Sequence, residues 1–113
     1  MASNPYARVT TLAFDIFGTV LDLTGSMTPP TRQFLQKKGA PVSAEVFYDQ
    51  WRARQRIEQY QDSLMMLGHS GYLETCRKAL IYCLRLNNIP VTDQEVRGLM
   101  QAWQGLTPYA DVA

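Results

Sequence analysis

The sequence has no long apolar run, little histidine or cysteine, and no excess of charge of either sign. None of its apolar runs approaches the roughly 18 residues that a membrane span needs, and the opening stretch MASNPYARVTT lacks the basic and apolar regions of a signal peptide. Eleven basic and ten acidic side chains leave a formal net charge of +1, which provides no electrostatic footprint for a nucleic-acid backbone. We therefore expect no membrane or nucleic-acid partner and a cytoplasmic location.

The few potential metal and redox ligands form no recognisable site. Cys76 and Cys83 are seven residues apart in a helical pattern, which separates their Cα atoms by about 10 Å, too far for an internal disulfide. We interpret them as two buried thiols, with a metal or redox pair as the alternative. His69 has no second histidine and no ligand-spaced cysteine or glutamate beside it, which favours a loop or capping role over metal binding. The sequence thus predicts no metal and no cofactor.

The composition, 113 residues with 46% hydrophobic and 19% charged, is that of one small globular domain. Residues 8–17, RVTTLAFDIF, are rich in β-branched and aromatic side chains and precede Gly18, which predicts a short buried strand of a parallel sheet. It is the only predicted strand. A lone strand needs partner strands for its backbone groups, and this sequence contains none.

Four helical segments are predicted after the strand. Thr28 is expected to cap the first, with Pro29 at its first position and an end near Lys37, Lys38 and Gly39. Ser43 begins a long second helix, which Gly68 closes. The expected core stripe of this second helix follows three- and four-residue steps and consists of Val46, Ala53, Ile57, Tyr60, Leu64 and Leu67.

The third helix is expected over about residues 70–87 and to be the most enclosed. Its core stripe is Leu73, Cys76, Leu80, Cys83 and Leu84, and Tyr72, Tyr82 and Leu86 make its other sides apolar. Thr92 and Glu95 have the spacing of a capping box for the fourth helix, whose core residues are Val96, Leu99, Met100, Trp103 and Leu106. The predicted fold is mainly α, with one N-terminal β-strand followed by a four-helix bundle.

Asp15 is the main candidate for chemistry. In open α/β sheets functional groups gather just beyond the carboxyl ends of strands, and Asp15 lies at such an end, shortly before Gly18. A carboxylate there can act as a nucleophile, steadied by backbone N–H groups and by the Thr19 hydroxyl. The alternative is an ordinary turn residue, because aspartate close to glycine commonly shapes loops.

The stretch FDIFGTVLD resembles the first motif of the haloacid dehalogenase superfamily, whose members use the leading aspartate as a covalent nucleophile on a Rossmann-like sheet. The phosphatase branch has a second aspartate two residues later and works with magnesium, whereas this sequence has Phe17, which cannot transfer a proton. An aromatic residue there resembles the type II, or L-2-haloacid, dehalogenases. The resemblance implies that Asp15 attacks a 2-haloacid beside Phe17 and that water hydrolyses the ester to a 2-hydroxy acid.

The stretch WRARQRIEQYQDSLM, which begins at Trp51, resembles the start of the long cap helix of those dehalogenases. There an arginine just after the tryptophan receives the halide and the substrate carboxylate, which implies Arg52 here, next to Trp51. Both residues fall off the expected core stripe, and a guanidinium can hold a carboxylate with two parallel hydrogen bonds. The alternative is a solvated arginine, like Arg54 and Arg56 on the same helix.

The tail AWQGLTPYADVA also resembles the family, where the last cap helix returns to the core domain through a Leu-x-Pro-aromatic turn. The resemblance implies three parts: residues 1–24 as first strand and nucleophile loop, 25–107 as a helical cap-like domain, and 108–113 as the start of the return to the core. It also implies that the later family residues, a Ser or Thr, a lysine and the final acidic groups, lie beyond Ala113. The chain would then be a fragment of a Rossmann-like α/β fold.

Three functions follow from these expectations. The first is a haloacid dehalogenase-like hydrolase that takes a 2-haloacid or a similar small organic acid and is incomplete in this chain. The second is a non-catalytic, truncated binding module, for instance a homodimer, suggested by the unpartnered strand and by apolar surface that a core domain would cover. The third is a non-hydrolytic isomerase or cyclase that binds an apolar metabolite beside Asp15.

Overall fold

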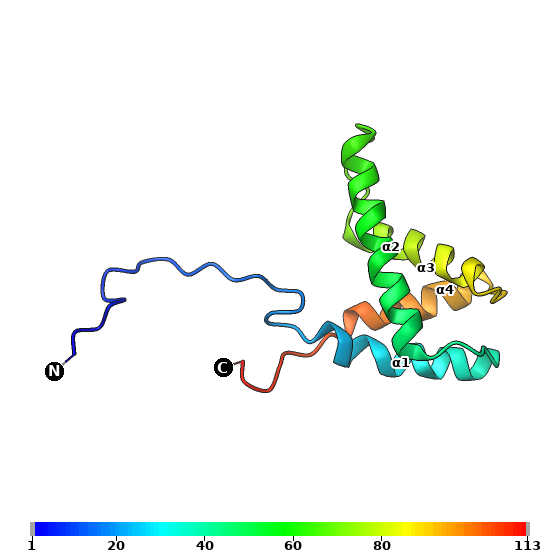
Figure 1. Ribbon diagram of the computed structural model, residues 1–113, viewed down its shortest axis with the longest axis horizontal. Helices are drawn as coiled ribbons and strands as arrows, with labels where there is room; N and C mark the ends of the chain where they lie inside the picture. Colours follow the sequence, from blue (N-terminus) through cyan, green and yellow to red (C-terminus); the bar gives the residue numbers. More distant parts are fainter. Residues whose placement is uncertain (1, 113) are drawn as a thin grey trace.

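The computed structural model describes residues 2–112, and the regular elements within that range are all helical. α1 spans Leu23–Lys38, α2 Ala44–Leu64, α3 Tyr72–Leu86 and α4 Asp93–Met100, and a 3₁₀ helix, η1, follows at Gln101–Gln104. Figure 1 shows the helices gathered together, with α2 crossing the others and the N-terminal segment running away from them. The predicted mainly helical class with four helices is confirmed.

The predicted N-terminal strand is not confirmed. Within the described range, residues 9–16 form neither strand nor helix, and the only β-type pairs are the isolated bridges Phe17–Leu21 and Leu21–Pro108. Leu12 is 73% exposed, and Phe14 is exposed as well. The physical reason is the missing partner, because an extended segment becomes part of a sheet only when another strand takes up its N–H and C=O groups.

α1 begins earlier than the prediction placed it. Asp22, not Thr28, is its N-cap: the Asp22 carboxylate accepts a hydrogen bond from a first-turn N–H at 2.9 Å, and Thr28 is buried inside the helix. Pro29 and Pro30 therefore lie within α1, where their fixed φ is compatible with a helix although each lacks a donor to the preceding turn. The end at Gly39 is confirmed, with a φ of 62° that favours glycine.

α2 begins at the predicted cap but buries a different face. The Ser43 hydroxyl accepts a hydrogen bond from the Val46 N–H at 3.2 Å. Most of the expected stripe lies outside: Leu64 is 81% exposed, and Val46, Ile57, Tyr60 and Leu67 are also exposed. The buried face instead carries Phe47, Tyr48, Trp51 and Gln55. Burying aromatic rings removes more apolar surface from water than burying aliphatic chains, so the aromatic face packs against α1 and α3.

α3 packs along α2 and contributes five fully enclosed apolar residues to the core. Four of them were predicted, Cys76, Leu80, Cys83 and Leu84, and Ala79 is the fifth. The expectation that every side of α3 is enclosed is wrong, because Leu73, Tyr82 and Leu86 are exposed. Within the described chain α3 packs mainly against α2 and α4, and apart from the contacts of Tyr72 with Phe17 and Trp103 its remaining side is in contact with solvent.

α4 is held by the predicted capping box. The Thr92 hydroxyl accepts a hydrogen bond from the Glu95 N–H at 3.2 Å, and the Glu95 carboxylate accepts one from the Thr92 N–H at 3.1 Å. The predicted core residues of this segment are all buried or packed against the core: Val96, Leu99, Met100, Trp103 and Leu106. The chain tightens into η1 after Met100, and this turn carries Trp103 into the core.

Candidate functional site

The turn after Asp15 brings two predicted site residues together. The Thr19 hydroxyl donates a hydrogen bond to an Asp15 carboxylate oxygen at 2.9 Å. Gly18 has a φ of 83°, which favours glycine, and its N–H bonds to the Leu21 C=O at 2.9 Å, while the Leu21 N–H bonds back to the Ile16 C=O. Asp15 is exposed. The carboxylate is therefore oriented by a hydroxyl and open to a ligand.

Phe17 connects this turn to the helices. Its ring stacks on the ring of Tyr72, with centroids 4.7 Å apart and planes inclined by 5°. Tyr72 is the first residue of α3. The stacked pair therefore places the turn that carries the candidate nucleophile against the start of that helix.

The last segment of the described chain lies beside the same turn. The Asp22 N–H donates to the Thr107 C=O at 2.8 Å, and the Tyr109 N–H donates to the Val20 C=O at 3.1 Å. The Ser26 hydroxyl also accepts a hydrogen bond from the Thr107 N–H at 3.0 Å. The beginning and the end of the helical part are thus joined to each other next to Asp15.

Arg52 is half-buried and bonded inside the fold. One guanidinium nitrogen donates hydrogen bonds to the Tyr72 hydroxyl, at 3.2 Å, and to the side-chain oxygen of Gln55. Arg54 is also half-buried but has other partners: it pairs with Glu58 at 2.8 Å and lies over the ring of Tyr82. Arg52 therefore differs from the solvated arginine that was the alternative, because its charge is directed towards Tyr72 and hence towards the ring of Phe17.

Trp51 lies in the core. Its side chain is 0% exposed, and its indole N–H donates to the Cys76 C=O at 2.8 Å. Its ring packs edge-on against Trp103, with centroids 5.8 Å apart. The structure thus gives Trp51 a packing role next to Arg52, and direct contact with a substrate stays a prediction.

The sequence interpretation missed a row of polar groups beside Arg52. Tyr48 and Gln55 lie one turn before and one turn after Arg52 on α2, and they are 3% and 1% exposed. The Tyr48 hydroxyl, the Gln55 amide nitrogen and the indole N–H of Trp103 have no hydrogen-bond partner among residues 2–112. Burial raises the pKa of Tyr48 to about 12 although Arg52 opposes this. The spacing Tyr-x3-Arg-x2-Gln was the available signal, but it is informative only once the buried face of α2 is known.

The two cysteines are buried free thiols, as predicted. Burial raises the pKa of Cys76 to about 12 and that of Cys83 to about 11, so neither forms a thiolate at neutral pH. Across residues 2–112 no three histidine, cysteine or acidic side chains lie together as metal ligands would. In the same range no helix combines the length and apolar character of a membrane span.

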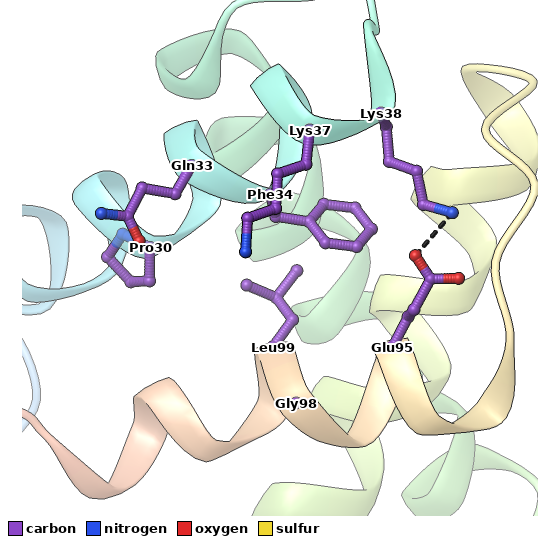
Figure 2. A pocket seen from close by; sticks show the side chains of 8 residues that line it. All are labelled: Pro30, Gln33, Phe34, Lys37, Lys38, Glu95, Gly98 and Leu99. Carbon is purple, nitrogen blue, oxygen red and sulfur yellow. Dashed lines mark ion pairs between the residues drawn. The ribbon is translucent and has the colours of Figure 1, made fainter.

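A separate groove with a volume of about 420 Å³ lies between α1 and α4. Figure 2 shows Phe34 of α1 and Leu99 of α4 along this groove, with Lys38 paired to Glu95 at one end. None of the residues predicted to do chemistry lines it. We therefore assign the candidate site to the surroundings of Asp15 and Arg52 and not to the groove.

In comparisons with known proteins, the chain matches solved structures but no family model and no curated sequence. Among solved structures it resembles L-2-haloacid dehalogenase from Xanthobacter autotrophicus, with a TM-score of 0.72 and 24% identity over 86% of this chain and 37% of that one. The same enzyme with chloropropionic acid covalently bound gives a TM-score of 0.67 and 22% identity over 87% of this chain and 37% of that one.

A further dehalogenase crystal structure gives a TM-score of 0.67 and 24% identity, over 87% of this chain and 40% of that one. The chain thus spans about two fifths of the length of the dehalogenases that it matches. At identities of 22–24% the likeness concerns the fold. The resemblance indicated by the sequence motifs is confirmed at that level: the chain has the fold of part of an L-2-haloacid dehalogenase.

Proposed function

We propose that the chain supplies the nucleophile and the anion-binding arginine of a hydrolase that acts on 2-haloacids. The observation that carries the proposal is the connection between the two groups. Phe17, two residues after Asp15, stacks on Tyr72, and the Tyr72 hydroxyl accepts a hydrogen bond from Arg52. The turn that carries Asp15 is thereby connected to the Arg52 guanidinium through two aromatic rings. The fold shared with L-2-haloacid dehalogenases supports the same assignment.

In the proposed first step, an Asp15 oxygen attacks the carbon that bears the halogen. A carbon–oxygen bond forms while the carbon–halogen bond breaks, and the halide leaves with the bonding electrons. The departing halide needs no proton, so Phe17 is compatible with this chemistry at a position where an acid would serve phosphoryl transfer. Arg52 carries only donors and a permanent charge, which suits it to hold the substrate carboxylate or the halide.

In the proposed second step, water attacks the carbonyl carbon of the Asp15 ester. The acyl carbon–oxygen bond breaks, the 2-hydroxy acid and a proton are released, and the Asp15 carboxylate is restored. The Thr19 hydroxyl, 2.9 Å from an Asp15 oxygen, orients the carboxylate for the first step.

Release of chloride from 2-chloropropionate by the purified chain tests this function. Asp15→Asn keeps an acceptor for Thr19 but is a poor nucleophile, so chloride release should fall to the uncatalysed rate. Asp49→Asn is the matched control, because Asp49 is an exposed carboxylate on α2, and it should leave the rate unchanged. Mass spectrometry should also find the substrate-derived ester on Asp15. Release that persists in Asp15→Asn would contradict the assignment.

A binding module that pairs with a second copy of the chain is the second candidate. It is favoured by the exposed apolar side chains of α2, among them Tyr60 and Leu64, and by those of the N-terminal segment, among them Leu12 and Phe14. Extended apolar surface of this kind usually marks an interaction site. Analytical ultracentrifugation should then show a dimer that Leu64→Glu dissociates, and a monomer at every concentration would contradict it.

A cytoplasmic location belongs to the same proposal. Cys76 and Cys83 are free and buried. Unpaired thiols are typical of proteins in reducing compartments, where disulfides do not persist.

A further inference from the structure

The row on α2 around Arg52 contains donors that the proposed reaction does not use. Tyr48, Arg52 and Gln55 follow one another at intervals of four and three residues, which places them on one side of the helix. Because a guanidinium carries donors only, the Gln55 amide must present its oxygen to Arg52, as observed. Its nitrogen is left as a donor. That nitrogen and the Tyr48 hydroxyl have no partner within residues 2–112.

A third donor comes from the element that faces this row. Trp103 in η1 packs edge-on against Trp51, at 5.8 Å, and against Tyr72, at 5.6 Å. Its indole N–H is also without a partner in the described range. The Tyr72 hydroxyl accepts from Arg52 and also lies within hydrogen-bond reach of the Cys76 thiol, so it adds no free donor to this row. The surroundings of Arg52 therefore present three side-chain donors that find no acceptor within residues 2–112.

Such a collection of donors is unusual in a packed interior. An unpaired buried donor destabilises the folded state, and buried polar groups therefore nearly always have partners. Here the three side chains with unpaired donors, Tyr48, Gln55 and Trp103, are at most 6% exposed. The Tyr48 hydroxyl is protonated at neutral pH, as tyrosine ordinarily is, and burial raises its pKa further, to about 12. What these three groups lack within residues 2–112 is an acceptor.

We propose that this row binds an organic acid that carries a second oxygen acceptor besides its carboxylate. The carboxylate pairs with Arg52, and a carbonyl or hydroxyl oxygen further along the acid accepts hydrogen bonds from Gln55 and Tyr48. The inference rests on the proposed function, because it takes Arg52 as the anion-binding residue. It narrows the substrate class from plain haloalkanoic acids to oxygen-substituted ones.

Three acids of equal charge and chain length test the effect of the second acceptor alone: pentanoate, which lacks it, and 2-oxopentanoate and 4-oxopentanoate, which carry it at different positions. Each is titrated into the purified chain and followed by NMR. At least one oxo acid should bind about tenfold more tightly than pentanoate, the gain expected for satisfying a buried donor. Tyr48→Phe should remove most of this preference. Tyr60→Phe, an exposed tyrosine on the same helix, is the matched control and should keep it.

The outcomes distinguish this inference from the function on which it rests. If the three acids bind equally and Arg52→Gln abolishes their binding, the anion site stands and the second acceptor is refuted. If none of the acids binds, the anion site and this inference both fail.

A measurement without ligand provides a second test. Tyr48→Phe removes an unpaired hydroxyl, so the ligand-free variant should melt at a higher temperature than the unmodified chain. A lower melting temperature would show that the hydroxyl has a structural partner, which would overturn its role as a ligand donor.

Discussion

The helical part and the N-terminal segment differ in what completes their hydrogen bonds and covers their apolar groups. In the helical part the backbone groups bond within each helix, and Phe47 and Trp51 are fully buried. In residues 10–15 no backbone hydrogen bond is formed within the described chain, and Leu12 and Phe14 are exposed. Both regions are rich in apolar residues, so composition does not separate them. A helix pairs most of its backbone N–H and C=O groups internally, whereas an extended segment needs another strand to pair them.

The largest effect is expected at the centre of the helical part. Trp51→Ala removes a fully buried indole and its hydrogen bond to the Cys76 C=O. The free energy of unfolding should fall by about 3–5 kcal/mol, measured by urea titration with circular dichroism. Tyr60→Ala, on the exposed side of the same helix, should change it by less than about 0.5 kcal/mol. Equal losses in the two variants would remove the distinction between a packed and an exposed face.

A smaller loss is expected at the start of α4. Thr92→Ala removes the hydroxyl that accepts from the Glu95 N–H, and loss of such a cap should lower the free energy of unfolding by about 1 kcal/mol in the same titration. Thr24→Ala is the control, since Thr24 is exposed within α1 and caps no helix. If the two variants were equally stable, the capping box would contribute nothing measurable.

The capping box should also respond to pH. The hydrogen bond from Lys38, followed by that from the Thr92 N–H, holds the pKa of Glu95 below its ordinary value of 4.5. A carboxyl whose pKa is lowered by folding contributes stability above its unfolded pKa and loses that contribution as the pH falls through the folded value. Thermal melts should therefore show stability decreasing below a pH of about 4.5, and Glu95→Gln should make this decrease smaller. An unchanged acid dependence would exclude Glu95 as its source.

The smallest effect is expected in the N-terminal segment. Leu12→Ser should change the free energy of unfolding by less than about 0.5 kcal/mol, because Leu12 is 73% exposed. Hydrogen exchange of the unmodified chain should find the amides of residues 10–15 exchanging almost as fast as in an unfolded chain. Protection of these amides would mean that a partner, such as a second copy, covers the segment, and the contrast between the two regions would then disappear.

The features that could be predicted from the sequence are those decided by neighbouring residues. The caps at Ser43 and Thr92 and the end at Gly39 each depend on groups within four residues. The pairing of Asp15 with Thr19 is of the same kind, because these residues are also four apart. In each case the hydrogen bond that stabilises the feature is local, so the pattern alone was sufficient.

The features that could not be predicted depend on contacts between distant segments. Packing against α1 and α3 determines which face of α2 is buried. The spacing of apolar residues in the α2 sequence is compatible with two different stripes, and only one of them is buried. Arg52 and Tyr72 are 20 residues apart, and only the packing of α3 on α2 brings them together. The start of α1 differs from the prediction because a proline is typical of a first turn but is also tolerated here inside the helix, and Asp22 caps α1 about two turns before Pro29.

The hydrogen bonds between residues 20–22 and 107–109 have a mechanical consequence. They hold these two short segments side by side. The chain therefore enters and leaves the helical part through one narrow neck, made of residues 20–22 and 107–109. Asp15 precedes this neck in the sequence, and Arg52 belongs to α2, within the helical part. The Phe17–Tyr72 stack is a second attachment, which holds the segment that carries Asp15 against the start of α3.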